Sequence, residues 1–228
     1  MTDVSHNGGR EDGAMAEQRR VGRPSTAVLS SERIVEAAFG LVRARGARGF
    51  TMTALAEDLG VRPSAIYHHV PGRDALIGRM RRRVSASIDR TPFEHEPIVD
   101  AFVAWGRSYR AAFASTPESI VLLATLPIDA DLESFDEYEL ITRRLVSEGW
   151  PIERTLDTIV AIESFILGSA LDALAPAGNM RPGAYADAVP TFARAEMARD
   201  AAGGDSAART FEIGLRALVA GLREWALG

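Results

Sequence analysis

The 228-residue chain contains no cysteine and no lysine, and it has no long run of apolar residues. Without cysteine it can form no disulfide, no thiol nucleophile and no cysteine-ligated metal site, which fits a reducing compartment. No apolar segment reaches the roughly 18 residues needed to cross a bilayer. The polar N-terminus also lacks the apolar core of a signal peptide. We therefore expect a cytoplasmic protein with no membrane partner.

The short motifs of common enzyme classes are missing as well. The sequence has no HExxH zinc motif, no glycine-rich phosphate loop and no evident nucleophile–base pair. His68 and His69 are adjacent, and neighbouring helical residues point about 100° apart, so they form a poor metal chelate. His95, between Glu94 and Glu96, is at best a weak metal site. We expect no enzyme, no cofactor and no metal, and a scattered all-α active site remains the alternative.

Because lysine is absent, all 26 basic residues are arginines, and they are unevenly distributed along the chain. Residues 1–90 carry 15 arginines against 10 acidic residues, whereas residues 91–228 carry 11 against 21. This division predicts a nucleic-acid-binding head on a body that avoids DNA. The lack of lysine is most simply a mark of a GC-rich genome, although guanidinium groups also suit bidentate phosphate contacts.

The spacing of apolar residues predicts an all-α fold, because helical periodicity recurs and no strand pattern competes with it. Residues 1–28 have few apolar side chains and are interpreted as a disordered basic tail. The basic end of this tail, residues 18–24, is either an arm that reaches DNA or a solvated linker. Short helices are expected in residues 29–75 and longer ones in residues 76–228.

Three short helices are predicted at the start of the ordered part. The first follows Ser30, a favourable N-cap, and ends at Gly46. Thr51 caps the second helix and Gly60 supplies the turn after it. A third helix over Pro63–His69 follows, with proline in its first turn. This arrangement is a helix-turn-helix, which places a short helix in the major groove of DNA.

Longer helices are expected in the rest of the chain. They cover residues 73–88, 97–115, 117–126, 132–147, 151–174 and 206–227, with breaks at 127–131, 176–183 and 202–205. The helix over 151–174 is apolar nearly all round, so we expect it to be buried on several sides. Residues 152–174 and 206–227 are expected to form a homodimer interface of four helices, and packing within one chain is the alternative.

The third helix exposes the residue types that read DNA. Its outward candidates are Arg62, Ser64, Ala65 and His68. Ser64 can donate to a phosphate or a base edge, and Ala65 can touch a thymine methyl group. Thr51, at a helix N-terminus, can offer its hydroxyl and backbone N–H to a phosphate.

A second group of residues is placed to contact phosphates. Tyr67, His69 and Arg73 are expected to set the register on DNA without reading its sequence. For Tyr67 the alternative is a place in the core. Arg79 and Arg81–Arg83 either reach flanking phosphates or form a solvated charged face.

Several motifs of residues 30–77 together are highly specific. They are Phe50-Thr51-Met52, Leu55-Ala56, Leu59-Gly60-Val61, Ala65-Ile66-Tyr67-His68-His69-Val70 and Arg73-Asp74-Ala75-Leu76. The stretch closely resembles the TetR family of bacterial transcriptional regulators. The resemblance implies operator contacts by Thr51, Thr53, Ser64, Ala65, Tyr67, His68, His69 and Arg73. Thr53 stands where tetracycline repressors have a base-reading arginine, so a different operator sequence is expected.

Residues 105–175 and 211–222 resemble, more loosely, the C-terminal domain of the tetracycline-repressor branch. This resemblance implies a homodimer that binds a palindromic double-stranded operator and is released when a small molecule binds in the body. The positions that border the implied pocket are Trp105, Tyr109, Leu122, Thr125, Leu156, Ile159 and Glu163. We expect a repressor with a small, mostly apolar effector. An activator, or a DNA-binding protein without a ligand, are the alternatives.

Two features of the implied pocket are open to more than one interpretation. Trp105, Tyr109 and Phe113 lie on one helical face, as either core or ligand contacts. Glu163 is a carboxylate on an otherwise apolar helix, which is costly unless it is paired. It either pairs with an arginine or orients a polar group of the ligand.

The implied pocket also departs from the family pattern. In tetracycline repressors one histidine coordinates magnesium and another contacts the drug. Leu122 and Asp89 stand at these positions here, so imidazole ligation is lost. We therefore do not expect the same metal-chelate mode of binding.

Overall fold

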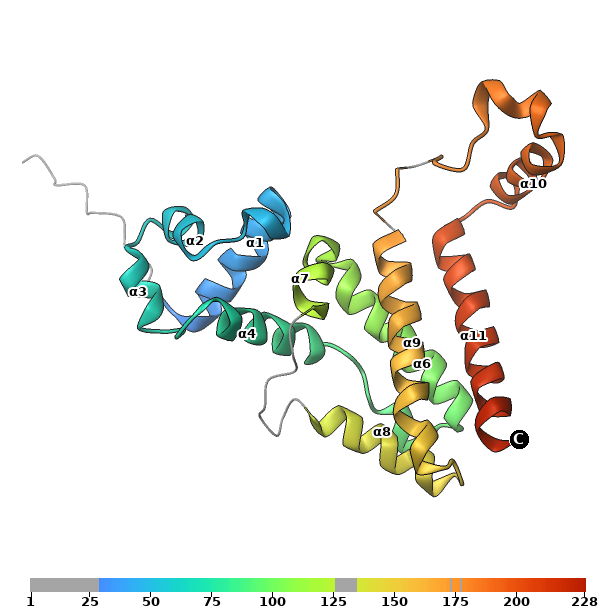
Figure 1. Cartoon of the computed structure of the whole chain (residues 1–228), viewed down its shortest axis with the longest axis horizontal. Coiled ribbons are helices and arrows are strands. Elements are labelled where there is room, and N and C mark those ends of the chain that lie inside the picture. Colours follow the sequence, from blue (N-terminus) through green and yellow to red (C-terminus); the bar gives the residue numbers. More distant parts are fainter. Residues whose placement is uncertain (1–28, 126–134, 173, 177) are drawn as a thin grey trace, which may run out of the picture.

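The computed structural model describes residues 29–125 and 135–228, apart from positions 173 and 177. Every regular element in this part of the chain is a helix, which confirms the predicted all-α fold. Figure 1 shows the N-terminal helices grouped as a head at one end and the remaining helices grouped as a body at the other.

The head consists of four helices and the body of the remainder. The head contains α1 (Ser31–Gly49), α2 (Met52–Leu59), α3 (Pro63–Tyr67) and α4 (Arg73–Ser85). The body contains α5 (Pro92–His95), α6 (Ile98–Ala114), α7 (Ile120–Ala124), α8 (Asp136–Ser147), α9 (Ile152–Asp172), α10 (Pro190–Ala201), α11 (Ser206–Leu227) and two short 3-10 helices, η1 (Pro117–Ser119) and η3 (Gly183–Ala188). None of the described helices is both long and apolar enough to cross a membrane.

Some predictions concern residues that the structure does not describe. These are the disordered tail over residues 1–28, its basic arm over 18–24, the break at 127–131 and the first residues of the helix predicted over 132–147.

Local signals in the head act as the sequence predicts. The hydroxyl of Ser30 caps α1 and that of Thr51 caps α2, where it accepts a hydrogen bond from the backbone N–H of Ala54 at 3.1 Å. Gly60 adopts the left-handed conformation, with φ at 66°, that the turn between α2 and α3 requires. Gly46, with φ at 68°, kinks the chain, and helical residues continue to Gly49. The helix-turn-helix is therefore fixed by short-range chemistry.

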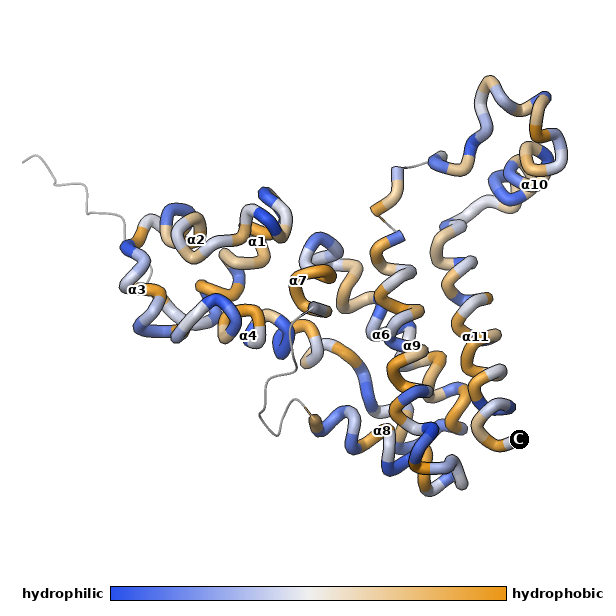
Figure 2. Tube along the Cα trace, in the orientation of Figure 1, coloured by the Kyte–Doolittle hydropathy of each residue, from blue (hydrophilic) through white to orange (hydrophobic). Residues whose placement is uncertain are grey.

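The core of the head continues into the body. Leu55, Ile66 and Leu76 are fully buried and hold α2, α3 and α4 together. The same apolar cluster includes Ile120 and Leu123 of the body. Figure 2 marks hydrophobic residues in orange on both α4 and α7, which are neighbouring helices. A movement of α7 would therefore displace α4, because the two helices share this packed core.

The body has its own aromatic and aliphatic core. Phe93, Phe102 and Trp105 meet edge to face, with ring centroids 5.1 to 6.1 Å apart. Helix α6 approaches α11 closely at Gly106, because a Cβ atom there would lie 2.8 Å from Cδ2 of Leu215. This close approach fixes the spacing of the two helices.

Two helices were missing from the prediction. Residues 92–95 form a short helix between the helices predicted over 73–88 and 97–115, because Pro92 starts a turn whose Phe93 is buried. Helix α10 was not predicted, since none of its residues is buried and it therefore lacks a clear apolar period. Within a single chain, Leu156 and Val160 of α9 are 54% and 51% exposed, so burial of this helix on several sides stays a prediction that includes a partner subunit.

Candidate DNA interface and ligand site

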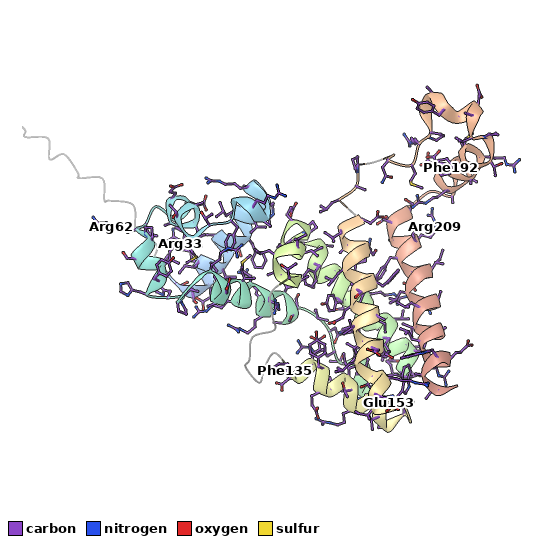
Figure 3. All side chains as sticks on the ribbon, in the orientation of Figure 1. Arg33, Arg62, Phe135, Glu153, Phe192 and Arg209 are labelled. Atoms are coloured by element: carbon purple, nitrogen blue, oxygen red, sulfur yellow. The ribbon has the colours of Figure 1, made fainter. Side chains whose placement is uncertain are left out.

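The head presents a polar surface built on α2, α3 and the start of α4. Eight of its nine predicted DNA-binding residues are exposed and Ala65 is half-buried; the eight are Thr51, Thr53, Arg62, Ser64, Tyr67, His68, His69 and Arg73. Tyr67 is 49% exposed, so the core alternative for it is wrong. Figure 3 places Arg62 at the edge of the head that is farthest from the body. The structure thus leaves eight of the predicted residues accessible to solvent on α2, α3 and α4 and in the turns beside them, and their contact with DNA stays a prediction.

The recognition helix α3 is short but firmly anchored. Ile66 and Val70 are fully buried beneath it, and the backbone N–H of Val70 donates to the carbonyl of Ile66 at 2.9 Å. Pro63 opens the helix after Arg62, whose backbone is extended. Because the apolar side chains point inward, Ser64 and its outward neighbours are left free for a partner.

Arg73 is held at the start of α4 by the turn before α2. Its guanidinium lies over the ring of Phe50, 5.4 Å from the ring centroid, and its Nε faces the carbonyl of Phe50 at 3.5 Å. Asp74 lies 3.8 Å from Nη1. This packing positions the arginine and leaves donors directed to solvent, as a phosphate contact requires.

Two arginines of α4 bind the first helix. Arg79 donates to the hydroxyl of Ser31, and Arg83 forms a 2.6 Å ion pair with Glu36. These residues were expected either to reach phosphates or to form a solvated face. The contacts instead connect α4 to α1.

Arg81 makes a different contact, toward the body. Its Nε and Nη2 both donate to the backbone carbonyl of Leu123, at 3.1 and 2.7 Å. Leu123 lies near the end of α7, whose last carbonyls have no partner within the helix. A charged donor on α4 therefore caps α7 and ties the head to the body.

In the body, side chains from α6 and α8 face Glu163 of α9. The hydroxyl of Tyr138 on α8 donates to both carboxylate oxygens at 3.2 Å. Burial, and then the nearby carboxylate of Glu137, raise the pKa of Glu163 to about 7, while hydrogen bonds from Tyr138 and Tyr109 partly offset this rise. Burial also raises the pKa of both tyrosines, so their hydroxyls remain protonated donors. The predicted pairing with an arginine is not what the described residues show.

Glu137 lies beside this cluster and is fully paired. The indole N–H of Trp105 donates to its Oε1 at 2.7 Å, and Nη2 of Arg90 lies 3.2 Å from its Oε2. Trp105 itself is fully buried in the body core, as the core interpretation of the aromatic stripe predicts. Tyr109 meets Trp105 edge to face and stacks on Phe113, with centroid distances of 5.2 and 5.3 Å.

Sequence reasoning missed two polar groups of α8: the hydroxyl of Tyr138 and the carboxylate of Glu137. A signal was available for Tyr138, because it shares a helical face with Ile141 and Leu145, both fully buried. No local pattern indicated that Glu137 would bind Trp105, 32 residues away. Long-range polar pairs of this kind follow only from the packing of α8 against α6 and α9.

The other predicted pocket residues are dispersed. Leu122 is buried in the cluster shared with the head, and Ile159 is fully buried in the body core. Thr125 is exposed and its hydroxyl donates to the carbonyl of Val121 at 2.7 Å. Leu156 is exposed on α9, on the same face as Glu163. Of the seven predicted pocket residues, Glu163 and Tyr109 face each other, and Leu156 lies on the exposed side of α9.

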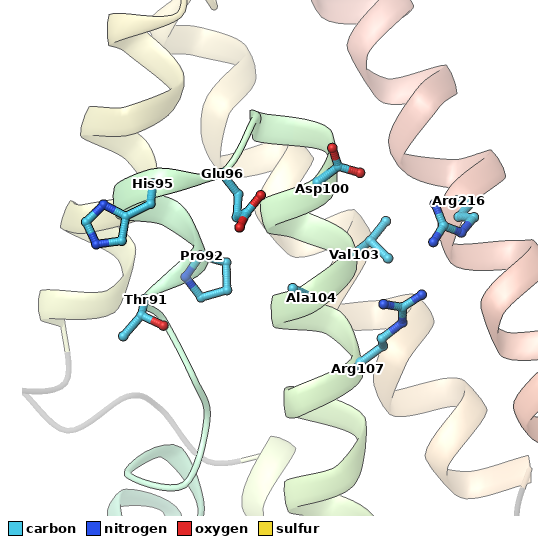
Figure 4. A pocket seen from close by; sticks show the side chains of 9 residues that line it. All are labelled: Thr91, Pro92, His95, Glu96, Asp100, Val103, Ala104, Arg107 and Arg216. Carbon is cyan, nitrogen blue, oxygen red and sulfur yellow. The ribbon is translucent and has the colours of Figure 1, made fainter.

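Two cavities lie elsewhere and contain none of the seven predicted pocket residues. One, of about 290 Å³, is lined by residues of α5 and α6, Thr91 and Glu96 beside α5, and Arg216 of α11, and Figure 4 shows Arg107 and Arg216 near each other between α6 and α11. Both arginines bind Glu212, and the hydrogen bond from Arg107 above all lowers the pKa of Glu212 to about 2. The other, of about 300 Å³, lies where α1 and α4 meet the end of α6.

The positions that depart from the family pattern have ordinary structural roles. The carboxylate of Asp89 accepts hydrogen bonds from the hydroxyl and backbone N–H of Thr91, at 2.7 and 2.9 Å, and these bonds lower its pKa. His95 lies 3.5 Å from Glu94 on the surface. Within the described part of the chain, no three His, Asp or Glu side chains are grouped to hold a metal ion.

The head and body define a class: a helix-turn-helix DNA-binding protein whose recognition unit is attached to a larger helical domain. Residues 34–80 match the model of the bacterial regulatory proteins of the tetR family. Residues 92–225 match the model of the tetracyclin repressor-like C-terminal domain. The chain belongs to the TetR family of bacterial regulatory proteins.

Known relatives extend over most of the chain. The tetracycline repressor protein class D of Escherichia coli is 26% identical over 204 residues, which is 85% of this chain and 88% of the relative. An HTH-type transcriptional repressor of Streptomyces coeruleorubidus is 25% identical over 158 residues, 67% of this chain and 56% of the relative. The chain therefore spans little more than half of the second relative.

Solved structures agree on the fold. The TetR family protein ActR of Streptomyces coelicolor, in complex with actinorhodin, superposes with a TM-score of 0.67 at 24% identity and covers 89% of this chain and all of that chain. Another TetR of the same organism has a TM-score of 0.63 at 27% identity, covering 87% of this chain and all of the other.

Proposed function

We propose that this protein is a ligand-responsive transcriptional repressor that binds a palindromic operator as a homodimer and is released by a small, mostly apolar molecule. One observation carries the proposal: α4, the helix that follows α3, is bonded through Arg81 to the carbonyl of Leu123 on α7, and the charge of Arg81 also acts on Tyr109 and Tyr138 beside Glu163. ActR, which shares the fold, was solved with actinorhodin, and this supports a small-molecule effector. The cytoplasm is the expected location, because operator DNA lies there.

Residues 29–75 act in this proposal as the DNA-binding unit, and residues 76–228 as the sensing and dimerisation unit. Arg62, Ser64, Ala65 and His68 would face base edges, while Thr51, Tyr67, His69 and Arg73 would hold phosphates. Threonine at position 53 can make only a single hydrogen bond to a base edge. The operator should therefore lack the guanine contact that an arginine makes there.

The dimer interface is proposed for the outer faces of α9 and α11. Gly168 of α9 and Gly221 of α11 are exposed, and an added Cβ at either would meet nothing within 4 Å in a single chain. Ile213 is 66% exposed on α11, and Ala217 lies one turn further along the same face. Small and apolar residues on two neighbouring helices suit close packing against a second copy.

The segment before α11 also supports a second copy. Figure 1 shows η3 and α10 extending away from the rest of the body, and neither contains a buried residue. Tyr185 and Met197 are 76% and 67% exposed, and Phe192 is 42% exposed. Several large apolar side chains exposed on one short segment are typical of a protein–protein interface, and here the partner subunit would bury them.

A genome-fragment binding selection with the purified full-length protein, followed by footprinting, tests the proposal. We expect protection of a short palindrome whose half-sites are about one helical turn of DNA apart, as a dimer with two heads requires. Failure to select any sequence at fixed salt would contradict the DNA-binding assignment. A ligand library that leaves operator affinity unchanged would favour a repressor without an effector.

A further inference from the structure

Glu163 is a largely buried acidic group of the body, and its described hydrogen-bond partners are uncharged. Its carboxylate oxygens accept hydrogen bonds from the hydroxyl of Tyr138, and the hydroxyl of Tyr109 also faces it. None of the described arginines or histidines lies within ion-pair distance of its oxygens. A carboxylate that is largely removed from water without a cation is destabilised, so the site favours a positively charged partner.

The neighbouring Glu137 provides an internal comparison. It lies on α8, one residue before Tyr138, forms an ion pair with Arg90 and accepts a hydrogen bond from the indole N–H of Trp105. The chain thus supplies a cation for one of two adjacent buried carboxylates and none for the other. The local field at Glu163 is therefore negative, since Glu137 further disfavours its ionisation.

The surroundings of Glu163 indicate what kind of cation fits. Leu156 and Val160 lie seven and three residues before it on the same face of α9, and both are about half exposed. The hydroxyls of Tyr109 and Tyr138, each carried on an aromatic ring, reach the carboxylate from α6 and α8. An apolar rim, two aromatic rings and one recessed carboxylate suit a cation with a large apolar body.

We propose that the effector is a hydrophobic amine or quaternary ammonium compound whose positive charge lies against the carboxylate of Glu163, between Tyr109 and Tyr138. This inference rests on the proposed function and deepens it by giving the effector a charge. The apolar part of the molecule would cover Leu156 and Val160. A neutral apolar molecule of the same shape would leave the carboxylate unpaired.

The test uses two probes that differ only in charge. One is the naphthylmethyl trimethylammonium ion, and the other is neopentylnaphthalene, its neutral carbon isostere. Binding of each to the full-length protein is measured by titration calorimetry at about pH 8, where the carboxylate of Glu163 is largely ionised. We expect the cation to bind at least about tenfold more tightly than the isostere.

Two matched variants locate the preference. Glu163→Gln should reduce the ratio of the two affinities to nearly one, because the amide keeps the shape of the side chain and removes its charge. Glu153→Gln makes the same change of charge at an exposed position of α9 and should keep the ratio of the parent protein. Figure 3 places Glu153 at the start of α9, about three turns away from Glu163.

The charge preference can also be tested without a variant, in case Glu163→Gln does not fold. The groups that face Glu163 are Glu137 and Tyr138 from α8, Tyr109 from α6 and, at longer range, Arg81 from α4. Glu163 is the group among them whose pKa is raised to about 7. The ratio of the two affinities should therefore grow as the pH is raised from about 5 to about 8.

Equal binding of the two probes, no binding of the cation, or a preference that survives Glu163→Gln would each overturn the inference. An operator-release assay on the same samples separates it from the proposed function. Release by the neutral isostere alone would overturn the inference and retain the repressor. Tight, Glu163-dependent binding of the cation with no operator recognition would retain the inference and remove the repressor.

Discussion

Tyr67 and Arg73 make the phosphate role of the head testable at single side chains. Tyr67→Phe and Arg73→Ala should each weaken binding several-fold on every operator sequence, because phosphates carry no base information. Arg73→Ala should also lower the slope of log affinity against log salt by about one. Fluorescence anisotropy at four salt concentrations would measure both effects.

The control for this pair is Arg223→Ala, which removes the same charge from an exposed position of α11 in the body. It should leave the salt slope unchanged. If Tyr67→Phe and Arg73→Ala behave like this control, the assigned phosphate contacts are wrong.

Glu163 should make the stability of the protein depend on pH. The unfolded chain releases the proton of Glu163 near the ordinary glutamate pKa of 4.5, whereas the folded protein releases it near 7, because burial penalises the charge. The folded state therefore binds more protons between these values, and its free energy of unfolding falls as pH rises through this window. Glu163→Gln should remove the fall and gain up to about 3 kcal/mol relative to the parent protein above pH 7.

Urea unfolding of both proteins at about pH 5 and about pH 8 would measure this difference. The exposed Glu153→Gln serves as the charge-matched control. A constant difference between Glu163→Gln and the parent across this range would show that the carboxylate is not destabilised by burial.

At the scale of elements, the close approach of α6 and α11 depends on Gly106. Gly106→Ala would place Cβ 2.8 Å from Cδ2 of the fully buried Leu215, so the two helices must separate or Leu215 must move. Overpacking costs about 1–3 kcal/mol, and the better helix propensity of alanine returns up to about 1 kcal/mol. We expect a net destabilisation of about 1 kcal/mol in urea unfolding.

Gly40 provides the opposite case. It is exposed within α1, and an added Cβ there meets nothing within 4 Å. Gly40→Ala should therefore stabilise the protein by up to about 1 kcal/mol. If Gly40→Ala and Gly106→Ala changed the free energy of unfolding in the same direction, the inferred close contact between α6 and α11 would be wrong.

Elements with local signals could be predicted from the sequence, and contacts between distant elements could not. The caps at Ser30 and Thr51 and the turn at Gly60 depend on neighbouring residues, so the helix-turn-helix was predicted closely. The bonds from Tyr138 to Glu163 depend on how α8 packs against α9, which no short window of sequence specifies. The cost of an unpaired Glu163 was visible in the sequence, but its partners were not.

For the whole molecule, the proposed dimer depends on the outer face of α9. Gly168→Leu adds a side chain where a single chain has open space, so each protomer should still fold. In a dimer the same side chain would fill the space needed for close helix packing. We expect dimerisation to weaken by at least about tenfold, measured by analytical ultracentrifugation with circular dichroism as the check on folding.

Gly40→Leu is the matched control, because it adds an equal apolar surface to an open position in the head. It should leave the oligomeric state unchanged. A dimer that is as stable in Gly168→Leu as in the parent protein would place the interface elsewhere.

The division of charge has a consequence for how the molecule meets DNA. Basic residues are in excess in the first 90 positions and acidic residues in the rest, and the helices of these two parts lie at opposite ends of the fold. Such a molecule has a large electric dipole moment. The electric field of the DNA duplex therefore orients the molecule as well as attracting it. Encounters should therefore occur head first, with fewer unproductive collisions than diffusion alone would give. Added salt would weaken this alignment together with the attraction, because it screens both beyond the Debye length of about 10 Å at 0.1 M salt.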